Sequence, residues 1–367
     1  MAVNIAFTGG GTAGHVLPNI ALIETTRTKL GQKIKEKVIT PFYFGSKNGM
    51  EVDIVKKSDL VTYIPISSGK LRRYFSWENF LSPFFIAKGF FEARAALKKN
   101  KIKVLFSKGG FVSAPVVWAA WTLSIPVLIH ESDFSPALTT KLTQPCAFKI
   151  FTAFEETRQH MSKQNQLKTT TIGIPLRDEL FDCDKNESIK HFKLNTDLPV
   201  LLVFGGSLGA AALNELIKPI LPSLDEKMNV IHLTGKGKSF PVEGLKYYHQ
   251  FEFLSDDMAL ALTASDFAFC RAGASSIFEL AALKKPMLLL PLGLKQSRGD
   301  QIENARYFTE RKWASMIDEE GLTSDKLLPL LLDLSDDIEV RKVSLESAPT
   351  HDGQQKISEC IVSLLNM

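Results

Sequence analysis

Cysteine is scarce in this chain, with four residues among 367 and none at paired spacing. A disulfide-stabilised scaffold needs cysteines in pairs, and a zinc site needs closely spaced Cys or His ligands. Neither requirement is met by Cys146, Cys183, Cys270 and Cys360, which lie far apart. The sequence therefore predicts free thiols in a reducing compartment and no metal site.

Long apolar runs are also missing. No stretch reaches the roughly 18 uninterrupted apolar residues of a membrane-spanning helix, and the nearest, residues 115–129, is broken by Thr122, Ser124 and Pro126. That stretch predicts a buried helix followed by a strand. The residues after Met1 lack the basic and apolar regions of a signal peptide, so we expect none.

Neither sign of charge is in large excess. The 44 basic and 40 acidic residues give a formal net charge of +4, which is too small to indicate a nucleic-acid partner. We therefore expect no nucleic acid, and an anionic partner would have to bind a local patch. With 45% hydrophobic residues over 367 positions, the chain is long and apolar enough for two globular domains.

One type of glycine-rich turn occurs twice. The segment Gly9–His15 (GGGTAGH) follows the apolar run 3–7, and Gly205–Ala210 (GGSLGA) follows the apolar run 198–204. Each turn precedes a helical stretch, so that backbone N–H groups and a helix N-terminus can face an anion. Only the first copy ends in a histidine, which predicts different tasks for the two halves.

Strands and helices alternate along the whole chain, which predicts an α/β protein with two doubly wound parallel sheets. A short β-like run closed by Gly and Pro, residues 169–177, separates the halves, and we place the hinge there. The expected domains are 1–174 and 175–349, with a C-terminal helix at about 350–367 packing back on the first. The expected strands are 3–7, 38–44, 103–106, 126–129, 148–151, 199–204, 228–233, 247–249, 266–270 and 286–290.

Two common nucleotide-binding classes are disfavoured. Gly9, Gly11 and Gly14 satisfy G-x-G-x-x-G, but an NAD-binding site also needs a carboxylate at the end of the second strand. The segments 42–46 and 230–235 supply none, and neither glycine turn has the lysine of a P-loop. What remains is diphosphate binding at the carboxyl ends of the strands, across a cleft between the domains.

Glu279 is the strongest ligand candidate of the second half. It lies one turn into a helix that follows a strand and a small-residue turn, where a carboxylate can accept hydrogen bonds from ribose hydroxyls. The spacing Ser276-x-x-Glu279 equally predicts a capping box. Asp300 and Gln301 open the next helix, and they suit either sugar hydroxyls or an ordinary N-cap.

Six ordered motifs resemble the MurG family, glycosyltransferases of family 28 that transfer N-acetylglucosamine from its UDP donor to lipid I, giving lipid II. The resemblance spans nearly the whole chain. It implies a GT-B fold of two Rossmann-like domains facing across a cleft, no cofactor or catalytic metal, and inversion at the anomeric carbon. It also implies UDP-GlcNAc and lipid I as partners and a peripheral location on the cytoplasmic face of the bacterial cell membrane. The motifs are residues 10–16, 107–113, 130–133, 205–210, 270–279 and 300–305.

On the acceptor side, the resemblance implies that Thr12, Gly14 and His15 lie at the reacting centre. Asp133 stands where the family has an amide, so it can accept hydrogen bonds from a sugar hydroxyl but cannot donate them. Three side chains, His15, Glu131 and Asp133, are candidates for the general base, and the sequence does not choose among them. For His15, a purely structural role in orienting its loop is the alternative.

On the donor side, the resemblance assigns six positions to UDP-GlcNAc. Asp300 again replaces an amide of the family. The assignments are Ser207 and Arg177 to phosphate, the Leu254 backbone to uracil, Glu279 to ribose, and Asp300 and Gln301 to the sugar hydroxyls.

A membrane dock is expected where Lys70, Arg72 and Arg73 precede an aromatic-rich stretch, residues 74–91, because basic and aromatic side chains together suit anionic lipid. Ordinary helix core with a charged rim is the alternative. Two other functions stay open: a GT-B glycosyltransferase or UDP-GlcNAc epimerase with a different acceptor, and a noncatalytic membrane-recruited partner.

Overall fold

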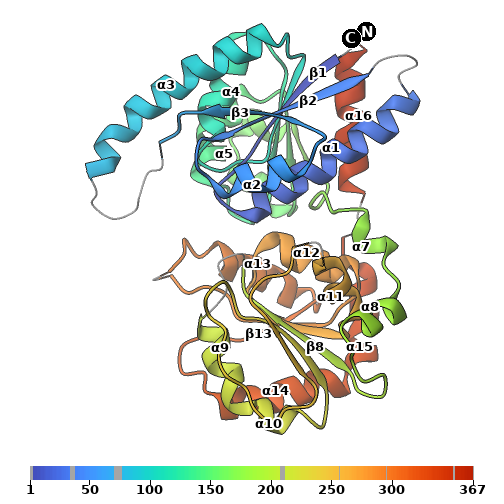
Figure 1. The fold of residues 1–367 in the computed structure, drawn as a ribbon. Helices are drawn as coiled ribbons and strands as arrows, with labels where there is room; N and C mark the ends of the chain where they lie inside the picture. Colours follow the sequence, from blue (N-terminus) through green and yellow to red (C-terminus); the bar gives the residue numbers. More distant parts are fainter. Residues whose placement is uncertain are drawn as a thin grey trace. The chain divides into compact units, whose positions relative to one another are not determined.

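The computed structural model describes residues 3–33, 38–69, 77–206, 211–255, 257–294, 296–349 and 352–366. It divides into two compact units. Unit 1 comprises residues 1–177 and 351–367, and unit 2 comprises residues 178–350. Each unit has a parallel sheet with helices packed on it (Figure 1).

In the described residues of unit 1, seven parallel strands form one sheet in the order β3-β2-β1-β4-β5-β6-β7. The order reverses direction between β1 and β4, so the loops after these two strands diverge at the carboxyl edge of the sheet. The strands are β1 (Val3–Thr8), β2 (Ile39–Ser46), β3 (Thr62–Ile66), β4 (Val104–Ser107), β5 (Val127–Glu131), β6 (Lys149–Thr152) and β7 (Thr169–Thr171).

Helices cover both faces of this sheet because its strands alternate between two cores. Ala6 packs in a core with Val116 of α4, whereas its neighbours Ile5 and Phe7 pack in another with Val16 of α1. The C-terminal helix α16 also belongs to the second core, through Ile357 and Ile361. The helices of unit 1 are α1 (Ala13–Lys33), α2 (Met50–Lys57), α3 (Trp77–Lys99), α4 (Ser113–Thr122), α5 (Leu138–Thr143), α6 (Lys163–Gln166) and α16 (Gly353–Leu365).

The sheet of unit 2 has six parallel strands among the described residues, in the order β10-β9-β8-β11-β12-β13. It again reverses direction beside its first strand, between β8 and β11. The strands are β8 (Val200–Phe204), β9 (Asn229–Leu233), β10 (Tyr248–Phe251), β11 (Phe267–Cys270), β12 (Met287–Leu289) and β13 (Ser315–Met316).

One core of unit 2 lies between this sheet and helices α9, α10 and α14, with Leu213, Leu224 and Leu331 packing on Val203 and Phe269. The helices of unit 2 are α7 (Glu179–Asp182), α8 (Lys185–His191), α9 (Ala211–Ile217), α10 (Leu221–Leu224), α11 (Met258–Ala264), α12 (Ala274–Ala282), α13 (Asp300–Glu310), α14 (Ser324–Asp336) and α15 (Ile338–Ser344).

All ten expected strands are confirmed to within two residues at each end, as are the buried helix and strand over residues 115–129. The sequence analysis missed β3 and β13. β3 is a half-exposed edge strand that contains Pro65, and β13 has only two residues, so neither shows a clear apolar alternation. Among the described residues, no helix is both long and apolar enough to cross a membrane.

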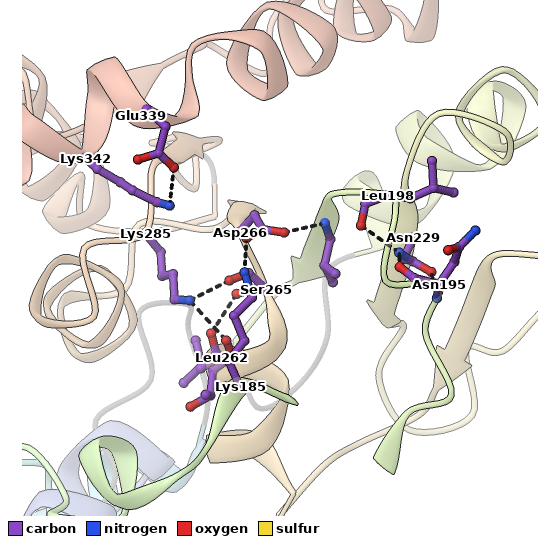
Figure 2. A network of polar contacts seen from close by, with 12 residues as sticks. Lys185, Asn195, Leu198, Asn229, Leu262, Ser265, Asp266, Lys285, Glu339 and Lys342 are labelled. Carbon is purple, nitrogen blue, oxygen red and sulfur yellow. Dashed lines mark hydrogen bonds and ion pairs between the residues drawn. The ribbon is translucent and has the colours of Figure 1, made fainter. Parts of the chain in front are cut away.

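Polar side chains close the amino edge of the unit 2 sheet (Figure 2). Asp266 accepts a hydrogen bond from the backbone N–H of Val200 at 2.9 Å and forms an ion pair with Lys185. Lys285 donates to two carbonyl oxygens at the end of α11, at 3.1 and 2.6 Å. Burial, together with the charge of Lys185, lowers the pKa of Lys285 to about 8. The charged side chains at this edge therefore bind to other groups of the protein.

Candidate active site

Two glycine turns of unit 1 touch each other at the carboxyl edge of its sheet. Gly110, after β4, has φ +85°, and a Cβ at this position would overlap the carbonyl oxygen of Gly10, after β1. A Cβ at Gly9 would lie 2.7 Å from the carbonyl oxygen of His15. Close packing of the two turns therefore requires these glycines.

Thr12 and His15 lie where the first of these turns enters α1. The Thr12 Oγ1 is 2.9 Å from the His15 Nδ1, and the exposed Thr12 thus fixes the ring of the half-buried His15. The ring also lies against the second turn, because a Cβ at Gly109 would be 3.9 Å from its Nε2. Gly14 is in the first turn of the same helix.

Glu131 organises the loop that follows β5. Its Oε1 accepts hydrogen bonds from the backbone N–H groups of Ser132 (2.9 Å) and Asp133 (3.1 Å). Its Oε2 accepts one from Ala137 (2.9 Å), and the residue is 4% exposed. Both carboxylate oxygens are therefore engaged in ordering the loop.

His130, buried at the end of β5, is held in the neutral form. Its Nε2 donates to the carbonyl oxygen of Gly173 at 2.7 Å. Burial holds the pKa of His130 well below its usual value, and the charge of Lys108 adds to the effect. The Nδ1 of His130 is buried and has no hydrogen-bond partner among the described residues.

Lys108 is a buried cation between these groups, and the sequence analysis included it only as a member of the motif 107–113. It is 1% exposed, and its Nζ donates to the Ser132 Oγ. Burial lowers the pKa of Lys108 to about 8, against the opposing effect of the Glu131 and Asp133 carboxylates. The sequence feature that could have identified Lys108 is its position directly after a mostly apolar strand.

The carboxyl edge of the unit 2 sheet differs, because its glycines leave open space. A Cβ added to Gly206, Gly273 or Gly293 would meet nothing within 4 Å among the described residues. These glycines follow β8, β11 and β12, which are neighbours in the sheet. Gly273 has φ −66° and ψ 132°, so neither its conformation nor its surroundings require glycine. An approaching ligand would explain the absence of side chains here.

Glu279 is half-buried in α12, close to this open edge. The capping-box alternative is wrong, because the N-cap of α12 is Gly273 and Ser276 lies inside the helix. Gly273 itself has no side chain with which to cap the first turn of α12, and this makes the helix N-terminus suited to an anion.

The start of α13 also differs from an ordinary capped helix. Its N-cap is Gly299, with φ +87°, so the N-cap alternative for Asp300 is wrong. The Asp300 Oδ1 accepts from the backbone N–H of Arg298 at 3.2 Å, and the Gln301 Oε1 accepts from that of Leu292 at 3.1 Å. Both side chains thus help to shape the loop before the helix.

The sequence analysis missed Arg271, although it lies within a quoted motif. This side chain is 5% exposed, and its Nη1 donates to the carbonyl oxygens of Leu290 (2.9 Å) and Pro291 (3.3 Å). An ion pair with Glu319 at 2.7 Å completes its contacts. Arg271 therefore fixes the loop after β12 relative to the end of β11.

The structure thus brings Thr12, His15, Glu131 and Asp133 to one edge of unit 1, and Glu279, Asp300 and Gln301 to one edge of unit 2. Leu254 is buried in the turn after β10, and Arg177 is half-buried at the end of the first segment of unit 1. No cluster of metal-ligating side chains occurs among the described residues. Four expected site residues lie outside the described residues: Ser207, Lys70, Arg72 and Arg73.

Comparison with known proteins identifies the same family for both units. Residues 5–152 match the glycosyltransferase family 28 N-terminal domain, and residues 200–359 match the family 28 C-terminal domain. The chain is 45% identical over 359 residues to a protein of Staphylococcus saprophyticus, covering 96% of this chain and 97% of the relative. It is 41% identical to a protein of Geobacillus kaustophilus, covering 97% of each. Both relatives are named UDP-N-acetylglucosamine--N-acetylmuramyl-(pentapeptide) pyrophosphoryl-undecaprenol N-acetylglucosamine transferase.

Solved structures share the fold. Acinetobacter baumannii MurG superposes with a TM-score of 0.73 at 23% identity, covering 100% of both chains. The UDP-GlcNAc 2-epimerase from Neisseria meningitidis superposes with a TM-score of 0.68 at 12% identity, covering 99% of this chain and 100% of the epimerase. These likenesses confirm the expected fold class, α/β with two parallel-sheet domains of the GT-B type.

Proposed function

Because the chain belongs to glycosyltransferase family 28, we propose that it transfers N-acetylglucosamine from UDP-GlcNAc to the C4 hydroxyl of the N-acetylmuramyl unit of lipid I, giving lipid II. The observation that carries the proposal is identity of 41% and 45%, over nearly the full length, to two transferases whose names state this donor and acceptor. As an inverting transfer, the reaction is one direct displacement in which UDP leaves opposite the attacking hydroxyl.

The open edge of unit 2 supports binding of the donor there. The diphosphate would approach Gly206 and Gly273 and face the N-terminus of α12. Glu279, five residues into that helix, would accept hydrogen bonds from the ribose hydroxyls. The remaining proposed contacts are Asp300 and Gln301 to the sugar, the Leu254 backbone to uracil, and Ser207 and Arg177 to phosphate.

The edge of unit 1 that carries Thr12 and His15 suits the acceptor. A general base contributes about 10²–10⁴-fold to such a transfer. Glu131 is a poor candidate, because its oxygens already accept three backbone N–H groups. The Asp133 carboxylate interacts electrostatically with the buried Lys108 ammonium, so it already has a partner within the protein. We therefore assign the base to His15.

This assignment requires one tautomer. For the Nε2 of His15 to accept the proton, its Nδ1 must carry hydrogen and donate to the Thr12 Oγ1 across their 2.9 Å contact. Thr12 would then hold the ring and stabilise the imidazolium that forms. The opposite tautomer, with the threonine hydroxyl donating to Nδ1, leaves Nε2 protonated and unable to act as base.

The test is transfer of labelled sugar from UDP-GlcNAc to a lipid I analogue. We expect His15→Ala to lower turnover by about 10²-fold or more while UDP affinity is unchanged. Thr12→Ser, which keeps the hydroxyl, serves as the matched control for Thr12→Val, which loses it. Turnover of purified His15→Ala equal to wild type would remove His15 from the mechanism. Conversion or transfer of the donor sugar without use of the lipid I analogue would favour the epimerase or a different acceptor.

We further propose that α3 contacts the anionic lipid of the membrane, on its cytoplasmic face, where the lipid-linked acceptor is held. Phe84 and Phe91 are 75% and 68% exposed on this helix, and Lys88 lies exposed between them. Phe90 is different, because it packs against the core. In Figure 1 the first turns of α3 project away from the unit 1 sheet. Exposed aromatics beside a basic residue suit a lipid surface.

A further inference from the structure

Lys108 is a buried charge at the edge of unit 1 that carries Thr12 and His15. Its ammonium group has three N–H donors, and among the described residues one donates, to the Ser132 Oγ. With 1% of the residue exposed, the ammonium group is shielded from bulk water. Removing an ammonium group from water is costly, and the lowering of the pKa of Lys108 to about 8 reflects that cost.

Two carboxylates act on Lys108 with opposite charge. They belong to Glu131, at the end of β5, and to Asp133, in the loop that follows. His130, also affected by His15, is neutral and contributes no charge.

Helix α2 also carries a carboxylate near the first glycine turn, that of Glu51. This carboxylate accepts hydrogen bonds from the backbone N–H of Ser46, at 3.0 Å, and from the hydroxyl of the same residue. The lysine thus balances the carboxylates of Glu131 and Asp133.

A residue that costs stability and is nevertheless buried beside a site is a candidate for a functional role. We propose that Lys108 is a positioning residue for the acceptor: its ammonium holds Ser132, and with it the loop that carries Asp133, in the arrangement that binds the acceptor sugar hydroxyls. This inference rests on the proposed transferase function and extends it to a residue that does not itself touch the reacting atoms.

Hydrogen-bond direction explains how Lys108 acts through its neighbours. Because the Ser132 oxygen accepts from the ammonium, its own O–H is left to donate to another group. The neighbouring Asp133 side chain offers acceptor oxygens to a sugar hydroxyl. An ordered pair of one donor and one acceptor can orient a hydroxyl-bearing ring, and a displacement of about 1 Å at such a site can cost about 10²-fold in rate.

The experiment measures kcat/KM for a lipid I analogue, from about pH 6.5 to about pH 9.5, with UDP-GlcNAc as donor. For wild type we expect a decline above about pH 8, as Lys108 loses its proton. Lys108→Met is expected to lower the acceptor kcat/KM by about 10²-fold and to abolish that decline, with the donor KM unchanged. Lys108→Arg, which stays charged, should recover part of the activity and move the decline to higher pH.

The matched control is Lys285→Met in unit 2, because burial also lowers the pKa of Lys285 to about 8. This control should leave the acceptor pH profile unchanged. Should Lys108→Met fail to fold, Ser132→Ala provides the test, with a lower acceptor kcat/KM at an unchanged donor KM.

An acceptor kcat/KM within about twofold of wild type in Lys108→Met, or in Ser132→Ala where that variant is needed, would overturn the inference. A wild-type decline near pH 8 that persists in Lys108→Met would do the same. Absence of transfer by wild type itself would overturn the proposed function instead, so the two failures are distinguishable.

Discussion

Substitution of Gly273 by alanine tests whether the open edge of the unit 2 sheet serves ligand binding or the stability of the fold. The backbone at Gly273 has φ −66° and ψ 132°, which alanine adopts without strain, and the added methyl would meet nothing within 4 Å. Losing glycine restricts the unfolded chain and stabilises by about 0.4–1 kcal/mol. Alanine is a poorer N-cap than glycine by a similar amount. The free energy of unfolding should therefore change by less than about 1 kcal/mol.

Donor binding should respond differently. If the diphosphate approaches the backbone at Gly273, the methyl occupies its space, and we expect affinity for UDP-GlcNAc to fall at least tenfold, or about 1.4 kcal/mol. Calorimetric titration with UDP-GlcNAc measures this, and urea unfolding of the same sample measures stability. The acceptor KM is the internal control and should not change.

Two results would refute the reasoning. Wild-type donor affinity in Gly273→Ala would mean that the diphosphate does not approach this backbone. A loss of several kcal/mol in unfolding free energy would mean that the space is needed by the fold.

Three further predictions concern packing, charge and the lipid surface. Gly110→Ala should cost more than about 2 kcal/mol in urea unfolding, because φ is +85° and the methyl overlaps the facing turn; an unchanged midpoint would contradict this. The pKa of Lys285 is about 8 in the folded protein and 10.5 in the unfolded chain. Between about pH 8 and pH 10.5 the unfolded chain therefore binds more protons than the folded protein, so the free energy of unfolding rises with pH. Relative to Lys285→Met, wild type should gain about 2 kcal/mol from pH 7.5 to 9.5, and a constant difference would argue against it. Phe84→Ser combined with Phe91→Ser should reduce sedimentation with anionic vesicles, whereas Phe253→Ser, at a 60% exposed position of unit 2, should not; equal sedimentation of all three proteins would exclude this face of α3.

Local patterns were sufficient for the elements and for the placement of the motifs. The apolar runs predicted ten strands because most of these strands are continuous and buried, and the glycine turns marked where several of them end. Local spacing was insufficient at Glu279. The same Ser-x-x-Glu pattern fits a capping box or a ligand, and only the start of α12 at Ala274, after Gly273, decided between the helix cap and other roles.

Charge and burial were the parts of the site that the sequence did not predict. Lys108 follows a strand of buried residues, but its own burial depends on Ser132, 24 residues away. Arg271 was quoted within a motif and given no role, because its partners Leu290 and Glu319 are distant in sequence. Side-chain environments of this kind arise from contacts between elements, which no local pattern encodes.

The sequence by itself determined the α/β alternation, the resemblance to family 28 and the order of the motifs, because these depend on residue type and on spacing within one segment. It distinguished the two glycine turns only by the histidine that ends the first of them. Tertiary structure decided how the surroundings of the two turns differ. At Gly10 the space that a Cβ would need is filled by Glu51 of α2 and by Val112, which precedes α4, whereas at Gly206 nothing among the described residues fills it. Which glycine serves packing and which leaves room for a ligand depends on the segment that the fold brings opposite it.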